Sequence, residues 1–82
     1  MTMTIEKSTS QTSTSRVMDI WRKILDHNEF STDDSFFDVG GHSLVATELA
    51  TALEKEFSIP LAAEIIFDRP TVNNLVEYIN QQ

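Results

Sequence analysis

The chain turns at Gly40-Gly41-His42-Ser43-Leu44, between an aromatic segment, Asp34–Asp38, and a patterned helical segment. Two successive glycines remove side-chain bulk and permit backbone conformations that other residues avoid. Ser43 follows at a position where a helix N-cap is expected. By itself, such a pattern predicts a capped helix after a glycine turn.

Residues 43–57 form an amphipathic pattern. At 100° per residue, its apolar side chains fall within an arc of about 100°, the width of a core stripe. They are Ala46, Leu49, Ala50, Leu53 and Phe57. Leu44 lies outside this stripe, on the side that carries Thr47, Glu48, Thr51 and Lys55, and Val45 and Ala52 lie at the margin. We therefore expect an exposed leucine directly beside Ser43, where it offers a docking contact.

Residues 15–28 form the other long helical pattern, with Ser15 as the expected N-cap and the end near His27 and Asn28. The spacing i, i+3, i+4, i+7, i+8 predicts one buried face. That face contains Val17, Ile20, Trp21, Ile24 and Leu25. Trp21 is expected to anchor the core.

The C-terminal part predicts two shorter helices. Pro60 breaks the chain, and residues 62–67 form a single turn or two bearing Ile65, Ile66 and Phe67, of which Ile66 is expected to be partly exposed. Thr71 is expected to cap a last helix, with fraying at its C-terminus. The buried stripe of that helix is Val72, Leu75, Val76 and Ile79. With no strand signal, the pattern predicts an all-α, small four-helix bundle of three main helices and a short third one.

The remaining segments have no regular pattern. Residues 1–14 are rich in Ser and Thr, and we expect a disordered tail followed by one domain over residues 15–82. Residues 29–42 form a long connection, a length that is often functional. Its apolar side chains are expected to pin the loop to the helices: Phe30, Phe36, Phe37 and Val39.

Composition excludes several function classes. The net charge of −7 disfavours nucleic acid and anionic membrane surfaces. There is no Cys, and the two His residues lie far apart. No register of Asp33, Asp34 and Asp38 fits an EF-hand, so a metal site is disfavoured. Neither a membrane span nor a signal peptide is visible, and we expect a cytoplasmic protein.

The run from Phe36 to Leu44, Phe-Phe-Asp-Val-Gly-Gly-His-Ser-Leu, closely resembles the core motif of peptidyl carrier (thiolation) domains of nonribosomal peptide synthetases. The resemblance continues through residues 57–61 and 66–72 to Val76. It implies the four-helix carrier-protein fold. It also implies 4′-phosphopantetheine on Ser43, within an attachment site that includes Gly41 and His42.

The resemblance further implies a carrier without catalytic activity of its own. A phosphopantetheinyl transferase would load it from coenzyme A. An adenylation enzyme and condensation, tailoring or thioesterase enzymes would then use the thioester on its arm. We expect a monomer whose partners dock on five residues: Leu44, Val45, Thr47, Ile66 and Phe37.

Other functions remain open at this point. An acyl carrier of a polyketide pathway is one, although His42 stands where such carriers more often have Asp. A non-modified helical interaction module, with Ser43 only as a cap, is another. A small hydrolase is disfavoured because Leu44-Val45 replaces the ending of a Gly-x-Ser-x-Gly elbow and no base is aimed at Ser43. The carried group, and whether the protein is free-standing or an excised domain, are not encoded.

Overall fold

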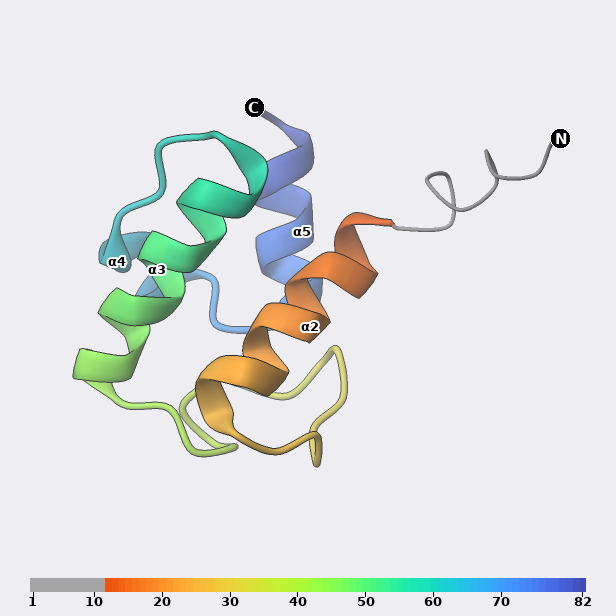
Figure 1. Ribbon diagram of the computed structural model, residues 1–82, viewed down its shortest axis with the longest axis vertical. Coiled ribbons are helices and arrows are strands. Elements are labelled where there is room, and N and C mark those ends of the chain that lie inside the picture. The colour runs from red at the N-terminus through yellow and green to blue at the C-terminus, as the bar shows by residue number, and fades with distance from the viewer. Residues whose placement is uncertain (1–11) are drawn as a thin grey trace, which may run out of the picture.

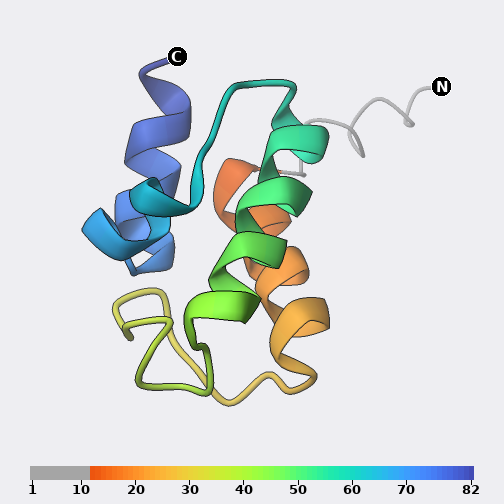
Figure 2. The ribbon, with the colours of Figure 1, turned by 90° about the vertical axis from the view of Figure 1, so that its left-hand side faces the viewer.

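The apolar stripes of the sequence become four helices in residues 12–82, the part of the chain that the computed structural model describes. They are α2 (Ser13–Leu25), α3 (Ser43–Phe57), α4 (Ala63–Asp68) and α5 (Val72–Asn80). The described residues contain no strand, and the predicted all-α bundle is confirmed. Helix α2 packs against both α3 and α5 (Figure 1), and Figure 2 shows the long connection after α2 at one end of the bundle.

Helix α2 begins earlier than predicted. Its N-cap is Thr12, whose Oγ1 accepts a hydrogen bond from Ser15 N at 3.1 Å. Ser15 is therefore a helical residue and not the cap, and residues 12–14, assigned to the tail, belong to the folded domain. The rest of the expected tail, residues 1–11, lies outside the described residues. The helix also ends earlier, at Leu25, because Asp26 takes a left-handed conformation with φ 64°.

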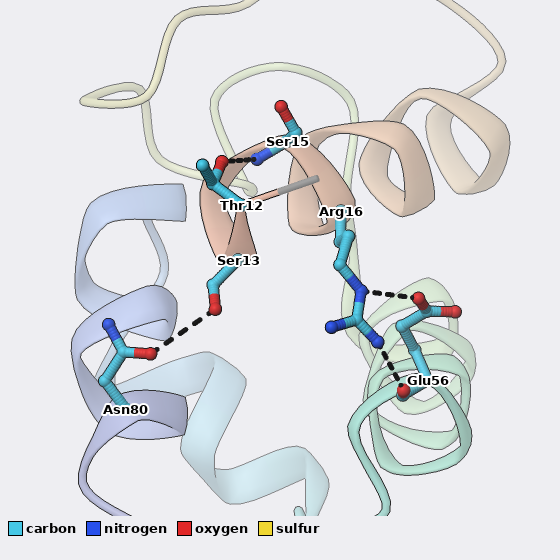
Figure 3. A network of polar contacts seen from close by, with 6 residues as sticks. All are labelled: Thr12, Ser13, Ser15, Arg16, Glu56 and Asn80. Carbon is cyan, nitrogen blue, oxygen red and sulfur yellow. Dashed lines mark hydrogen bonds and ion pairs between the residues drawn. The ribbon is translucent and has the colours of Figure 1, made fainter. Parts of the chain in front are cut away.

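Polar contacts fasten the start of α2 to both neighbouring helices (Figure 3). Ser13 Oγ donates to Asn80 Oδ1 of α5 at 3.3 Å. Arg16 Nε donates to Glu56 Oε2 of α3 at 2.8 Å, and Arg16 Nη2 donates to Glu56 O at 2.9 Å. An ion pair this close to solvent contributes about 1 kcal/mol or less, so these contacts mainly fix the orientation of α2.

The core gathers side chains from every helix and from the long connection. Its fully buried large side chains are Trp21, Phe36, Leu49, Leu53, Ile66, Leu75, Val17 and Val72. The indole of Trp21 lies against two rings of the connection, with centroid distances of 5.4 Å to Phe30 and 5.2 Å to Phe36. Each fully buried side chain of this size stabilises the fold by about 1.5–3 kcal/mol. The predictions of Trp21 as anchor and of aromatic residues pinning the connection are confirmed.

Helix α3 has the predicted bounds and the predicted buried face. Ala46, Leu49, Ala50 and Leu53 are buried. Phe57, at the end of the stripe, is partly buried and is covered by the guanidinium of Arg16, 4.4 Å from its ring centroid. Leu44 is 68% exposed, as expected from its position outside the stripe.

Helix α4 orients its apolar residues differently from the prediction. Ile66, expected to be partly exposed, is 0% exposed, whereas Phe67 is 52% exposed. Ile66 is the buried residue of this six-residue helix, which begins at Ala63 and packs against α3. Phe67 instead stacks on Phe37 of the long connection, with ring centroids 5.1 Å apart and an interplanar angle of 11°.

Helix α5 starts as predicted. Thr71 is its N-cap, and Thr71 Oγ1 accepts a hydrogen bond from Asn74 N at 3.0 Å. Val72, Leu75 and Ile79 are buried and Val76 is partly buried. Helix α5 packs against α2 and thereby completes the bundle around Trp21.

Candidate functional site

The long connection between α2 and α3 is held in place by α5 and the segment before it. Phe36 N donates to Pro70 O at 2.7 Å, while its ring fills the core. Asn73 N donates to Thr32 O at 3.1 Å, and Asn73 Nδ2 donates to Asp33 Oδ1 at 2.6 Å. The connection is thus a packed, hydrogen-bonded loop, and it delivers the start of α3 at a defined place.

Each of the two glycines has a separate structural reason. Gly40 has φ 121°, a conformation that L side chains rarely adopt. At Gly41 a Cβ atom would lie 2.3 Å from the ring atoms Cδ2 and Cε2 of Phe36 and 2.7 Å from Phe36 O. Gly41 N donates to that same oxygen at 2.9 Å. Gly41, expected at the attachment site, therefore lets the backbone pass over a buried ring.

His27 ties the end of α2 to the residues before the glycines. Its Nε2 lies 2.6 Å from Val39 O, and its Nδ1 accepts from Glu29 N at 2.9 Å. Because a carbonyl only accepts, Nε2 carries the proton in this arrangement. Periodicity does not reveal this role, since both partners are backbone atoms that follow His27, at separations of 2 and 12 residues.

Ser43 is the first residue of α3 and is exposed. Ser43 was predicted as the N-cap, but the N-cap is the preceding residue, His42, which has an extended backbone at φ −148°. His42 makes no side-chain capping bond. Ser43 is therefore free of the capping duty that the sequence suggested, and its hydroxyl is left for other chemistry.

The first turn of α3 suits an anion. The first hydrogen bond of the helix backbone is donated by Ala46 N to His42 O, at 2.8 Å. The N–H groups of Ser43, Leu44 and Val45 precede it, where a helix has no internal acceptors. This turn contains no acidic residue. A phosphodiester on Ser43 Oγ would meet these N–H groups and the positive end of the helix dipole without a competing carboxylate. The residues present therefore fit a phosphopantetheine group.

The predicted docking residues separate into those near the surface and one in the core. Leu44 and Thr47 are exposed beside Ser43, and Val45 and Phe37 are partly buried. Ile66 is buried, so its assignment to partner recognition is wrong. Phe67, which the sequence reasoning passed over, is exposed instead. Three apolar residues in succession hid which of them faced the solvent.

Two acidic residues of the connection, Asp33 and Asp34, have structural partners. Asp34 Oδ2 accepts from Ser31 N at 2.9 Å, and Asp33 is bonded to Asn73. Within residues 12–82 no cluster of three or more His, Asp or Glu side chains is arranged to hold a metal ion. None of the helices in this same range has the length and apolar character needed to cross a membrane.

Comparison with known proteins agrees with this geometry. A family model described as "Phosphopantetheine attachment site" matches residues 15–79. Gramicidin S synthase 2 of Brevibacillus brevis is 36% identical over 64 residues, which is 78% of this chain but 1% of that protein. The chain thus corresponds to a very small part of such a relative.

Solved structures extend the similarity to the fold. One is a complex of the phosphopantetheine transferase Sfp with coenzyme A and a peptidyl carrier protein. The similarity to it has a TM-score of 0.82 and 28% identity, over 87% of this chain and 92% of that one. Another is a peptidyl carrier domain described as a prototype for modular peptide synthetases, with a TM-score of 0.74 and 31% identity, over 83% of this chain and 90% of that one.

Proposed function

The chain belongs to the phosphopantetheine attachment-site family, and we propose that Ser43 is the residue on which it carries 4′-phosphopantetheine. It is a carrier-protein domain of the kind found in nonribosomal peptide synthetases. The observation that carries the assignment to Ser43 is its place: an exposed hydroxyl at the first position of α3, without a capping duty, directly after two glycines.

The attachment reaction requires little of this chain. Ser43 Oγ attacks the β-phosphorus of coenzyme A, the Oγ–P bond forms, and the bond to the departing adenosine 3′,5′-bisphosphate breaks. The proton of Ser43 passes to a base of the transferase, because no described side chain is hydrogen-bonded to Ser43 Oγ. The first-turn N–H groups of α3 then stabilise the phosphodiester by about 0.3–1 kcal/mol. The attached group supplies a thiol that holds an aminoacyl or acyl group as a thioester.

Partner enzymes are proposed to dock around Ser43. Leu44 and Thr47 flank it on α3, and the stacked pair Phe37 and Phe67 adds an exposed apolar surface from the connection and α4. Apolar side chains that are exposed together in one patch mark interaction surfaces, whereas single exposed apolar residues are normal. Among the described residues, the large hydrophobic side chains that are exposed are Leu44 and Phe67. Phe67 thus takes the role first given to Ile66.

The proposed partners are a phosphopantetheinyl transferase, an adenylation enzyme, and condensation, tailoring or thioesterase enzymes. The relatives that are peptide synthetases and peptidyl carriers favour a peptidyl role over that of a polyketide acyl carrier. We propose that the chain works in the cytoplasm and performs no chemistry itself, which the lack of a base at Ser43 supports.

Intact mass spectrometry tests the proposal. The chain is incubated with coenzyme A, magnesium and a broad-specificity phosphopantetheinyl transferase, beside Ser43→Ala and Ser13→Ala. Ser13 is a matched control because it is likewise the first residue of a helix, α2. We expect one phosphopantetheine adduct on the wild type and on Ser13→Ala, and none on Ser43→Ala.

The opposite results separate the rival functions. An adduct that persists on Ser43→Ala would move the attachment to another residue. Absence of any adduct on a folded wild type, with two different transferases, would favour the non-modified interaction module. A third result concerns the loaded wild-type chain without its partners. If it hydrolysed its thioester faster than a free pantetheine thioester is hydrolysed, a purely carrying role would be contradicted. Ser43→Ala would lose this hydrolysis only because it is not loaded.

A further inference from the structure

The outer face of α3 is more apolar than its residue types indicate. Thr47 Oγ1 donates to Ser43 O at 3.3 Å, and Thr51 Oγ1 donates to Thr47 O at 3.1 Å. Because both hydroxyls are bonded to the helix backbone, the threonine methyl groups are left to face outward with Leu44. These side chains border a shallow, open groove of about 380 Å³, lined by Leu44, Thr47, Glu48, Thr51, Ala52 and Lys55.

A second groove continues the first one. It lies between α2 and α3, has a volume of about 310 Å³, and is lined by Ile20, Lys23, Ile24, Ala52, Lys55 and Glu56. Ala52 and Lys55 line both grooves, so the two grooves meet at these residues, with Leu44 on the side of Ser43 and Ile20 and Ile24 of α2 on the other side. We call this continuous surface the α3 groove.

The far end of the α3 groove is positively charged in an otherwise acidic chain of net charge −7. In residues 12–82, Arg16, Arg22 and Arg69 each pair with a carboxylate. Lys23 and Lys55 are the basic side chains of this range without an ion pair, and both line the groove. The acid of this end, Glu56, is bonded to Arg16. An apolar floor between two ammonium groups fits an apolar chain that ends in an anion.

The length of the groove matches the group carried on Ser43. Twelve residues separate Ser43 from Lys55, which corresponds to about 18 Å along the helix axis at 1.5 Å per residue. The phosphopantetheine arm has about fourteen bonds from the serine oxygen to its sulfur. At ~1.2 Å per bond, the advance of an extended polypeptide, it spans about 17 Å. Glu48 lies about 7.5 Å from Ser43 along α3, beside the uncharged middle of the arm.

We propose that the α3 groove is the resting site of the loaded arm, with the acyl group at its far end, and that Lys23 and Lys55 favour acyl chains that end in a carboxylate. This proposal rests on attachment at Ser43. The phosphate end stays at the first turn of α3, the neutral arm follows the methyl groups of Thr47 and Thr51, and the acyl group reaches the lysines. A cargo with a free ammonium group is repelled by the same lysines and stays in solvent.

Two cargoes of equal chain length test the proposal. The transferase loads Ser43 with a glutaryl or a pentanoyl arm from the corresponding acyl-coenzyme A, and backbone amide NMR shifts are compared. We expect the glutaryl form to shift Thr51, Ala52, Lys55 and Ile24, with a bound population about two- to five-fold higher than for pentanoyl, as for an exposed charge pair. High salt should reduce the difference.

Matched variants identify the lysines. Lys23→Ala/Lys55→Ala should abolish the difference between the two cargoes. Arg22→Ala should retain it, because Arg22 is an exposed basic residue next to Lys23 that pairs with Asp19 and does not line the groove. Equal shifts for both cargoes, or shifts confined to residues 40–47, would overturn the proposal while intact mass still shows loading. Failure of loading itself would overturn both this proposal and the attachment at Ser43.

Discussion

Replacing Gly41 by alanine tests the packing that sets the start of α3. The added methyl group would lie 2.3 Å from two ring atoms of Phe36 and 2.7 Å from its carbonyl oxygen. The ring has no space to retreat, because Phe36 is fully buried and packs edge-on against Trp21 at 5.2 Å. The carbonyl is fixed by its bond from Gly41 N at 2.9 Å. Main chain and ring must therefore both move.

The cost follows from these contacts. Overpacking a filled core costs about 1–3 kcal/mol, and disturbing the Trp21–Phe36 pair adds about 0.5–1.5 kcal/mol. We expect Gly41→Ala to lower the free energy of unfolding by about 2–4 kcal/mol. In a domain of this size, each kcal/mol corresponds to about 4–8 °C in Tm. The change is a large part of the roughly 5–15 kcal/mol that stabilises a small domain.

Urea denaturation followed by Trp21 fluorescence measures this cost, since Trp21 is the single tryptophan and is buried beside Phe36. Gly40→Ala is the comparison: its Cβ would have neighbours no closer than 3.7 Å, and its cost comes from φ 121° alone. Phe36→Leu replaces the ring that the methyl group meets with a smaller aliphatic side chain. The double variant with Gly41→Ala should therefore cost less than the sum of the single variants, by about 0.5–3 kcal/mol.

Two results would refute the reasoning. One is an unfolding free energy of Gly41→Ala within about 0.5 kcal/mol of the wild type, the range of an uncomplicated surface substitution. The other is strict additivity with Phe36→Leu, which would place the cost outside the contact with the ring. The carbonyl contact at 2.7 Å persists in the double variant, so the expected rescue is partial.

Two further predictions concern capping and docking. Thr71→Ala should lower the unfolding free energy by about 0.5–2 kcal/mol, because it removes the bond to Asn74 N, whereas Ser43→Ala should change it by less than about 0.5 kcal/mol. Urea denaturation of both variants measures these changes. An equal cost for the two variants would mean that Ser43 acts as a cap. Ile66→Ala should lower the unfolding free energy by about 2–5 kcal/mol and leave kcat/KM of the transferase unchanged. Phe67→Ala should lower kcat/KM of the transferase, with a loss of about 0.5–1.5 kcal/mol in unfolding free energy. The reverse pattern in loading kinetics would remove Phe67 from the docking surface.

The periodicity of apolar residues predicted the features that are set within a single helix, such as its bounds and its buried face. The bounds and buried face of α3 follow from the spacing of Ala46, Leu49, Ala50 and Leu53, and the start of α5 from Thr71. The start of α2 was missed because several Ser and Thr residues precede Val17, and each is an acceptable cap. With Thr12 as the cap, Ser13 contacts α5 and Arg16 contacts α3. The choice of cap therefore depends on tertiary contacts, which the sequence pattern does not contain.

Contacts between distant segments were beyond the sequence pattern. Which of the apolar residues of α4 is buried depends on how this short helix lies against α3, and a single turn contains no periodicity to reveal it. The stacking of Phe67 on Phe37 joins a residue of α4 to a residue of the long connection, 30 positions earlier in the chain. The apolar outer face of α3 was hidden for another reason, since Thr47 and Thr51 count as polar until their hydroxyls are seen bonded to the backbone.

The distribution of helix caps connects stability with the site. Helices α2 and α5 each have a capping threonine at the N-terminus, and they pack against each other. The N-cap of α3 is His42, which makes no side-chain capping bond, so this helix lacks the roughly 0.5–2 kcal/mol that a capping side chain contributes. Burial of Leu49 and Leu53 offsets this loss several-fold. Because tertiary packing holds α3, its first turn is free to present an unbonded hydroxyl and N–H groups to another molecule, which is the requirement of an attachment site.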